Sequence, residues 1–205
     1  MKKFLLSIIL LLTLTGVEKA SAQFRYGATA GVDLTTLNFK QDLISIDQSV
    51  GYQAGLQCEM MFPGIGFGID FGLLYQQRGA TLNLGEKLVW SSLGYGKERL
   101  YLHDVIIPID LRFKWTRMDG FEDYLAPYVF GGPVIAFTVA HNNLDAMSNA
   151  GGNLGVQVGL GAEIFKKWQI QGSYMWGMTY STKTKLLDDF SARDRVWSVR
   201  VIRYF

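Results

Sequence analysis

Charged side chains recur within the otherwise apolar segments of this 205-residue chain. Both signs are present there in equal number, as four carboxylates and four cations. The eight residues are Glu59, Asp70, Asp110 and Glu163 with Arg25, Arg112, Lys114 and Arg200. Charges that leave water must pair, because an isolated buried charge is very costly. We therefore predict that these residues form ion pairs with one another inside the fold.

Histidine and serine residues are the other materials for catalysis in the sequence. His103 stands beside Asp104, and His141 is the second histidine of the chain. An enzyme acting on lipid, such as a hydrolase or acyltransferase, would need a nucleophile near such a base. The serines that could supply it are Ser91, Ser92 and Ser181. Because a histidine near a serine arises far more often by chance, we expect a non-enzymatic protein and keep a lipid-modifying enzyme as the least favoured alternative.

Metal and cofactor sites have little support in the sequence. The chain has two histidines and one cysteine, Cys58, so neither a metal cluster of usual spacing nor an intramolecular disulfide can form. The segment Gly94-Tyr95-Gly96 is too short for a phosphate-binding loop. We expect no catalytic, cofactor-binding or metal-binding residues, and we expect Cys58 to face lipid.

The segments that carry the charges alternate between apolar and polar residues with a period of two. This pattern is typical of a β-strand with one apolar face. The clearest case is 153–164, where every second residue from Leu154 to Ile164 is apolar. Each segment has about the ten residues with which a tilted strand crosses a bilayer. The predicted strands are 24–34, 50–60, 67–76, 105–115, 128–140, 153–164, 168–180 and 195–205. The segment 128–140 is apolar on both faces, which leaves its register open.

Residues 1–22 are predicted to be a signal peptide, and residues 23–205 a single domain. The basic pair Lys2-Lys3 precedes an apolar run at 4–14, and Ala20-Ser21-Ala22 supplies small residues at a cleavage site. Without the signal peptide the chain carries 17 basic and 17 acidic residues, so its charge gives no indication of a nucleic-acid partner. No run of 18 apolar residues follows, which argues against a helical membrane protein.

The polar face of the strands is predicted to point inward. A soluble lipocalin-like barrel would also alternate, but its water-facing exterior would be richer in lysine and glutamate. Here the polar face carries mainly glycine and glutamine with a few charges of both signs, which suits the narrow interior of an eight-stranded barrel. Because side chains fill such an interior, we interpret the charged residues as a structural lattice and not as a conduction path or a proton relay.

Long and short connections alternate between the predicted strands, as in barrels of the bacterial outer membrane. The long ones, predicted to be outer loops, are 35–49, 79–100, 141–152 and 181–194, and the short ones are 61–66, 165–167 and the longer link 116–127. The sequence therefore predicts an all-β, eight-stranded antiparallel up-and-down transmembrane β-barrel in the outer membrane, with both termini in the periplasm. The final strand ends on Phe205, which we expect the outer-membrane assembly machinery to read as a signal.

Residues 103–115 resemble a strand of the PorT-like outer-membrane β-barrel family in which Ile-Pro precedes hydrophobic, lysine and aromatic residues. Residues 127–134 are similar to that family's strand with Pro-Tyr and Gly-Pro, 155–165 to its glycine-rich strand with a late glutamate, and 197–205 to its closing strand. The resemblance covers nearly all of 23–205. It implies an eight-stranded outer-membrane barrel without a shared catalytic motif, and the founding member implies a link to protein secretion.

The loops and the resemblance together favour a barrel that binds a partner. Trp90 and Tyr95 lie in the charged loop 79–100, and Phe121 lies in the link 116–127. We predict these residues as contacts to a periplasmic or secretion-system protein, with outer-membrane lipid around the barrel. Two alternatives stay open: the loops are merely solvated, or the barrel is a narrow channel for small solutes.

Overall fold

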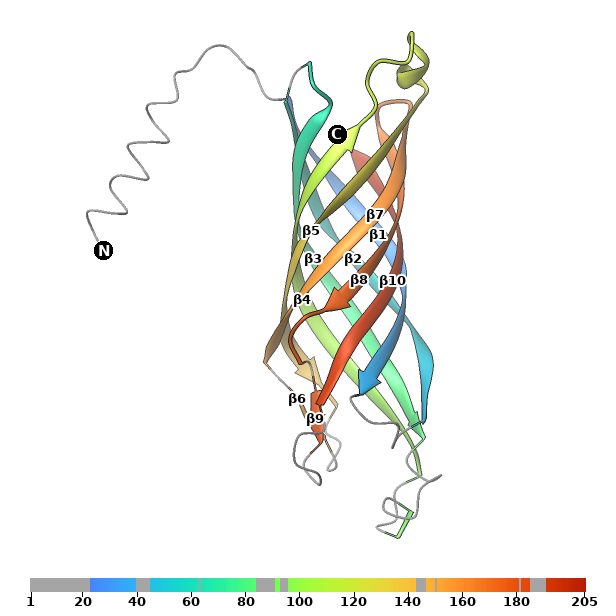
Figure 1. The fold of residues 1–205 in the computed structure, drawn as a ribbon, viewed down its shortest axis with the longest axis vertical. Coiled ribbons are helices and arrows are strands. Elements are labelled where there is room, and N and C mark those ends of the chain that lie inside the picture. The colour runs from blue at the N-terminus through green and yellow to red at the C-terminus, as the bar shows by residue number, and fades with distance from the viewer. Residues whose placement is uncertain are drawn as a thin grey trace, which may run out of the picture.

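Eight long strands form the wall of a closed antiparallel barrel in the computed structural model (Figure 1). They are β1 (Gln23–Phe39), β2 (Ser45–Met61), β3 (Phe67–Asn83), β4 (Lys97–Lys114), β5 (Leu125–His141), β7 (Gly152–Ile164), β8 (Trp168–Gly177) and β10 (Ser191–Tyr204). Each long strand pairs with the next one along the chain, and β1 pairs with β10 to close the ring. The predicted eight-stranded antiparallel barrel is therefore confirmed.

Three short elements lie outside this wall. The strands β6 (Met147–Asn149) and β9 (Thr182–Thr184) pair with each other, and β9 also pairs with the start of β10. A 3-10 helix, η2 (Phe121–Asp123), lies in the link between β4 and β5. Among the described residues, no helix is long and apolar enough to cross a membrane. The structure describes residues 23–39, 45–62, 64–83, 91–92, 96–142, 147–149, 151–180, 182–184 and 191–205, so the expected signal peptide lies outside it.

The strands run farther than the alternation predicts. β1, β2 and β3 have 17 residues each, against the ten or so that cross a bilayer. The added residues are ones predicted as outer loops, because much of 35–49 and 79–100 is paired as strand. Backbone hydrogen bonds between strands need no apolar face, so the ladder continues where the outward side chains turn polar, as at Thr36 and Asn38. Strand residues also occur in other predicted connections: β6 within 141–152, β9 and the start of β10 within 181–194, and the start of β5 within 116–127. In contrast, β8 ends at Gly177, before the predicted end at 180.

The polar face of the alternation points into the barrel, as predicted. In β7, Gln157 is buried, whereas Val158 and Leu160 are 47% and 69% exposed on the outer surface. Glutamine and charged residues make up most of the buried polar set, and leucine, valine and aromatic residues make up most of the exposed apolar set. This inside-out arrangement is the one a membrane-spanning barrel requires, since lipid surrounds its exterior.

The register of β5, which its sequence leaves open, is set by its inward side chains. Tyr128, Phe130 and Val134 are buried, whereas Val129 is exposed on the outside. Toward the C-terminal end of β5, His103 pairs with Ala140 but Asp104 pairs with Thr138. The residue between them, Val139, therefore forms a bulge in β5. Two large aromatic side chains therefore enter the interior from β5, and small residues must face them.

The wall is tightest where β4 meets β5 around Gly132. A Cβ atom at this position would lie 2.0 Å from the carbonyl oxygen of Ile109 and 2.9 Å from the Cα of Asp110. Neither contact can be relieved by a rotation of a side chain, because both atoms belong to the backbone of β4. Glycine at 132 is thus needed for the two strands to approach.

Substituting Gly132 by valine is therefore expected to disrupt the barrel. The clash with the backbone of β4 should destabilise the folded form by about 3 kcal/mol or more. A folded barrel migrates differently on an unboiled gel from the boiled, unfolded chain, so most of the Gly132→Val protein should migrate like the boiled chain. Gly151→Val is the control, because nothing lies within 4 Å of a Cβ at that exposed glycine. Equal folded fractions for the two variants would contradict this account of Gly132.

Candidate functional site

The buried carboxylate of Glu59 lies at the centre of a polar network in the half of the barrel nearest the termini. Its Oε1 accepts from Arg25 Nη2 at 2.7 Å and from Lys114 Nζ at 3.0 Å, and its Oε2 accepts from Arg112 Nη1 at 2.6 Å. The side chain of Gln169 donates to the same Oε2 at 2.8 Å. Four strands therefore meet at one carboxylate, and the side chain of Glu59 is 0% exposed.

Glu163 and Asp70 complete this network. Glu163 is paired with Arg25 and accepts from Lys114 Nζ at 3.2 Å, and Asp70 is paired with Arg112. Three carboxylates thus face three cations, so the charge of the network is balanced. The guanidinium of Arg112 also lies 4.1 Å from the ring centre of Tyr128, which covers the network from β5. We call this set, Arg25, Glu59, Asp70, Arg112, Lys114 and Glu163, the mouth network.

The other two residues of the predicted lattice lie one layer deeper. With its amide nitrogen toward the Tyr128 hydroxyl, Gln171 accepts through its carbonyl oxygen from Arg200 Nε at 3.0 Å and Nη2 at 2.9 Å. Asp110 accepts from Gln157 Nε2 at 2.7 Å. Both Arg200 and Asp110 are buried, so all eight predicted residues point into the barrel and six of them form one network.

A second network, at the end away from the termini, was not predicted from the sequence. Arg78 is paired with Asp104 and with Asp194, and its Nη2 donates to Asn153 Oδ1 at 3.2 Å. Asn153 in turn donates to Asp194 Oδ2 at 2.5 Å. Arg78 lies just beyond the predicted strand 67–76, and Asp194 lies in the predicted loop 181–194, whereas both belong to strands in the structure. Extending the alternation of β3 by two residues, from Gln76 to Arg78, would have found this network.

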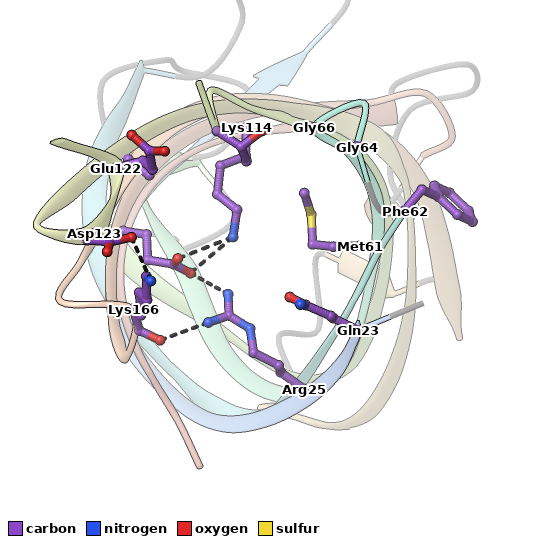
Figure 2. A pocket seen from close by; sticks show the side chains of 13 residues that line it. Gln23, Arg25, Met61, Phe62, Gly64, Gly66, Lys114, Glu122, Asp123 and Lys166 are labelled. Atoms are coloured by element: carbon purple, nitrogen blue, oxygen red, sulfur yellow. Dashed lines mark hydrogen bonds and ion pairs between the residues drawn. The ribbon is translucent and has the colours of Figure 1, made fainter. Parts of the chain in front are cut away.

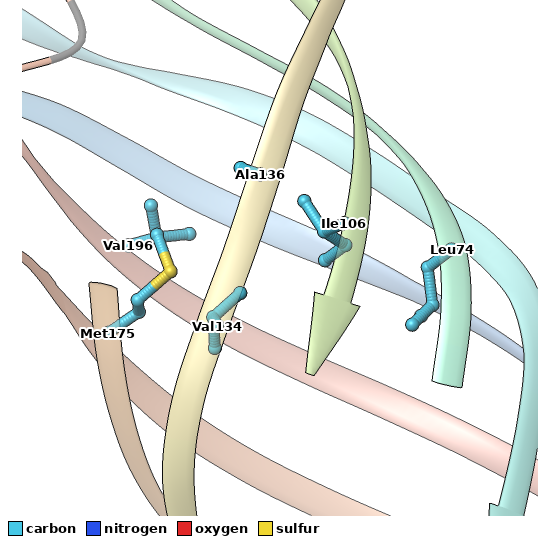
Figure 3. Close-up of a cluster of buried hydrophobic side chains, with 6 residues drawn as sticks. All are labelled: Leu74, Ile106, Val134, Ala136, Met175 and Val196. Carbon is cyan, nitrogen blue, oxygen red and sulfur yellow. The ribbon is translucent and has the colours of Figure 1, made fainter. Parts of the chain in front are cut away.

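An apolar layer of six buried side chains from β3, β4, β5, β8 and β10 lies between the two networks; Figure 3 shows these side chains. Along β4 the inward residues run from Asp104 of the far network through Ile106 to Asp110 and Arg112. Along β10 they run from Asp194 through Val196 to Arg200. The full layer consists of Leu74, Ile106, Val134, Ala136, Met175 and Val196. Beside this layer, the buried Asp33 on β1 accepts hydrogen bonds from Gln53 Nε2 at 2.6 Å and from Gln76 Nε2 at 2.9 Å. The interior between the two networks is therefore filled by packed side chains, apolar on one side and hydrogen-bonded polar on the other, which opposes conduction.

Three residues of the mouth network line a cavity of about 440 Å³ at the end of the barrel where Gln23 and Phe205 lie (Figures 1 and 2). Arg25, Lys114 and Glu163 line its inner side, and Glu122, Asp123 and Lys166 line its rim. Lys166 Nζ lies 2.6 Å from Asp123 Oδ1, and this hydrogen bond holds the pKa of the Lys166 ammonium above its usual value. The cavity thus has a polar floor and a rim that carries both signs of charge.

The rim of the cavity is organised by the link between β4 and β5. Glu122 Oε2 accepts from the backbone N–H groups of Met118 and Gly120, both at 3.0 Å. The N–H of Phe165, in the turn between β7 and β8, donates to the Tyr124 carbonyl oxygen at 3.0 Å, and their rings pack edge to face at 6.2 Å. The link is therefore tied to the neighbouring turn. The link contains Phe121, a predicted partner contact, whose side chain is 51% exposed.

The other predicted residues are not brought together into a site. His103 points outward and its Nδ1 lies 2.5 Å from the Tyr75 hydroxyl, whereas Asp104 points inward to Arg78. Neighbouring residues of a strand face opposite sides, so His103 and Asp104 do not form a dyad. Phe205 is exposed and its N–H donates to the Tyr26 carbonyl oxygen at 3.0 Å; its role in assembly stays a prediction.

Two predicted partner contacts, Trp90 and Tyr95, lie outside the described residues, as does Ser181. Cys58 is partly exposed and alternates with the buried Gln57 and Glu59, which places it on the outer face of β2. Within the described part of the chain, no group of three or more histidine, cysteine, aspartate or glutamate side chains is arranged to hold a metal ion.

A closed barrel with an apolar exterior and a paired polar interior defines the class of transmembrane β-barrel proteins of the outer membrane. Residues 18–183 match the family described as outer membrane protein beta-barrel domain, and the chain belongs to that family. Membership supports a location in the outer membrane. A comparison with curated proteins finds no significant match.

Solved structures of small outer-membrane barrels resemble this fold. The outer membrane protein OprG from Pseudomonas aeruginosa has a TM-score of 0.53 and 12% identity, over 89% of this chain and 94% of that one. Neisserial surface protein A has a TM-score of 0.46 and 11% identity, over 89% and 97%. The Ail protein of Yersinia pestis, in a complex with the heparin analogue sucrose octasulfate, has a TM-score of 0.46 and 12% identity, over 89% and 99%. At these identities the likeness concerns the fold alone.

Removing one charge from the mouth network is expected to destabilise the barrel. Arg112→Met leaves Glu59 and Asp70 without their shared cation, which should cost about 3–5 kcal/mol of unfolding free energy. Urea unfolding in lipid vesicles, followed by tryptophan fluorescence, measures this change.

The control is Arg99→Met, which removes an exposed arginine near the other end of the barrel and should change the free energy by less than about 1 kcal/mol. The account of the mouth network would be contradicted if both substitutions had the same small effect.

Proposed function

We propose that this protein is a non-conducting, non-enzymatic outer-membrane barrel that binds a periplasmic protein at the mouth where its termini lie. The proposal includes an orientation with both termini in the periplasm. It is supported by the connections: the turns at 62–66 and 165–167 and the link 115–124 join strands at the end where Gln23 and Phe205 lie, whereas the two longest connections, 84–96 and 178–190, join strands at the other end.

The observation that carries the proposal is the conformation of Phe165. Phe165 and Lys166 have φ angles of 50° and 58°, in the left-handed region that a bulky side chain adopts only at a cost. The strained turn nevertheless holds the Phe165 ring 63% exposed, beside the 64% exposed Tyr124. With Phe121 these residues form an exposed aromatic surface, the mouth aromatics, on a backbone fixed by hydrogen bonds. A merely solvated loop would need neither the strain nor the aromatic rings.

The alternatives draw less support. A narrow channel would need an open path along the axis, whereas packed side chains fill the interior, among them Leu74 and Val196 of the apolar layer and the hydrogen-bonded Asp33. A lipid-modifying enzyme would need a base with an acidic partner, and Asp104 faces away from His103. Within a partner-binding role, a link to protein secretion rests on the resemblance to the PorT-like family.

Replacing Phe165 by glycine tests partner binding separately from stability. Glycine adopts the left-handed region without strain, and this gain offsets the lost packing of the Phe165 ring on Tyr124 and the greater freedom of glycine in the unfolded chain. Phe165→Gly should therefore change the unfolding free energy by no more than about 1 kcal/mol. The same variant should capture at least one periplasmic protein less efficiently, by about fivefold or more, as expected when an aromatic anchor is lost. Crosslinking of outer-membrane fractions followed by quantitative mass spectrometry measures the capture.

The control for this experiment is Phe24→Ala, which removes an exposed aromatic ring at the same end but on the lipid-facing wall of β1. It should leave the captured proteins unchanged. An identical set of captured proteins in wild type and Phe165→Gly would remove the proposed partner-binding role.

Conductance measurements test the closed interior. The purified barrel in a planar bilayer should show no regular conductance steps, because packed side chains fill its interior. Steps of uniform size that increase with salt concentration would instead support the narrow channel.

A further inference from the structure

An apolar groove on the outer surface of the barrel differs from the rest of the wall. It has a volume of about 790 Å³ and runs across β1, β10, β8 and β7. Gly172 forms its floor, and the exposed side chains of Leu160 and Val199 stand on either side, since both pair with Gly172 across the sheet. The groove faces the lipid, as does the surrounding apolar surface.

Close approach of neighbouring strands does not explain the glycine at 172, which forms the groove. A Cβ atom at Gly172 would have a single neighbour within 4 Å, the Ser198 carbonyl oxygen at 3.9 Å, whereas one at Gly132 would clash with the backbone. A larger side chain would therefore fit at 172. The glycine leaves a hollow that the fold itself does not require.

Aromatic rings border the groove on the side away from the termini. Tyr174 lies with its ring centre 4.5 Å from that of Trp176 and 4.5 Å from that of Trp197. Tyr174 and Trp197 are also direct partners in the ladder between β8 and β10. Tryptophan and tyrosine favour the headgroup level of a bilayer, so the groove opens toward the headgroups at this cluster.

Two arginines follow the aromatic cluster along β10. Arg193, Arg195, Trp197 and Val199 are alternate residues of one strand, so they lie in a row on the same outer face. Arg195 pairs with Trp176, and Arg193 lies with its guanidinium 5.3 Å from the ring centre of Tyr180. From the end of the barrel inward, the surface thus presents two cations, then aromatic rings, then an apolar groove.

We infer that this surface binds one phosphate-bearing lipid of the surrounding leaflet, with an acyl chain in the groove and the phosphate at Arg193 and Arg195. Guanidinium groups bind phosphate through charge-assisted hydrogen bonds. The order of cations, rings and apolar groove matches the order of phosphate, interface and chain in such a lipid. Under the proposed orientation, on which only the choice of leaflet rests, the lipid belongs to the outer leaflet.

A second copy of the barrel is the other occupant that an apolar groove could take. The row of arginines favours the lipid, because a partner surface at this depth would have to supply buried anions for them. The experiment below separates the two, since a lipid adds the mass of one lipid and a second copy doubles the mass.

Native mass spectrometry of the detergent-solubilised full-length barrel tests the inference. The probe is lipid A, an acylated and phosphorylated disaccharide, compared with diacylglycerol, a lipid that carries no phosphate, and with inorganic phosphate. One lipid A should bind per barrel. The double variant Arg193→Gln/Arg195→Gln should weaken its apparent affinity by about tenfold, and inorganic phosphate should not compete because it cannot occupy the groove.

Two further variants define the site. Arg203→Gln is the matched control, since Arg203 is exposed on the same strand at the opposite end and lies over Trp168, so lipid A binding should not change. Gly172→Phe should fold, because the space beside Gly172 is open, and should lose binding by filling the groove. If this variant does not fold, the arginine pair decides alone.

Equal affinity of lipid A for wild type and for the double arginine variant would overturn the inference. Equal binding of diacylglycerol, or a dimer in place of a lipid adduct, would overturn it as well. Binding in detergent depends neither on orientation nor on a periplasmic partner. Failure of this experiment is therefore distinguishable from failure of the proposed function.

Discussion

The pairing of Glu59 with Arg25, Lys114 and Arg112 is the interaction on which the rest of the barrel depends. A strand that shows lipid an apolar face must turn its other face inward, and in a ring of eight strands little space is left there for water. The charges on that face can be accommodated only if they meet opposite charges at hydrogen-bonding distance. The mouth network does this with three carboxylates and three cations contributed by five strands, β1, β2, β3, β4 and β7. It consequently fixes the register of those strands relative to one another as well as the charge of the interior.

The layered interior gives the molecule its functional character. Polar networks at both ends with an apolar layer between them describe a barrel whose walls and contents form one packed body. A rigid body of this kind can hold binding surfaces in a fixed geometry. The two proposed binding surfaces lie at different places on the barrel. The mouth aromatics lie at the end of the termini, and the arginine row and its groove lie on the lipid-facing wall toward the other end. Binding at either surface requires no movement of the interior.

Much of this could be predicted from the sequence, because alternation with a period of two reports directly which residues share a face. It identified the strand at 153–164 and the eight residues of the inner lattice. Residues such as Arg78 and Asp194 were missed because the strands continue past the bilayer, where outward side chains are polar and the alternation loses its contrast. The pairing of specific partners, such as Arg25 with Glu163 across 138 residues, depends on the stagger of the closed ring. The groove at Gly172 was hidden for another reason: the sequence does not distinguish a glycine required by close strands from one that leaves a hollow.

The most direct measurement of the central claim is the accessibility of the interior to water. In a Cys58→Ser background, Val196→Cys places a thiol in the apolar layer, where Val196 is 1% exposed, and Gly151→Cys places one on the exposed surface. A water-soluble, membrane-impermeant maleimide is added to the folded barrel in vesicles that have been made accessible from both sides. The account predicts rapid labelling at 151 and none at 196 until the protein is unfolded. Labelling of the folded barrel at 196 at a rate near that at 151 would show a water-filled interior and contradict the account.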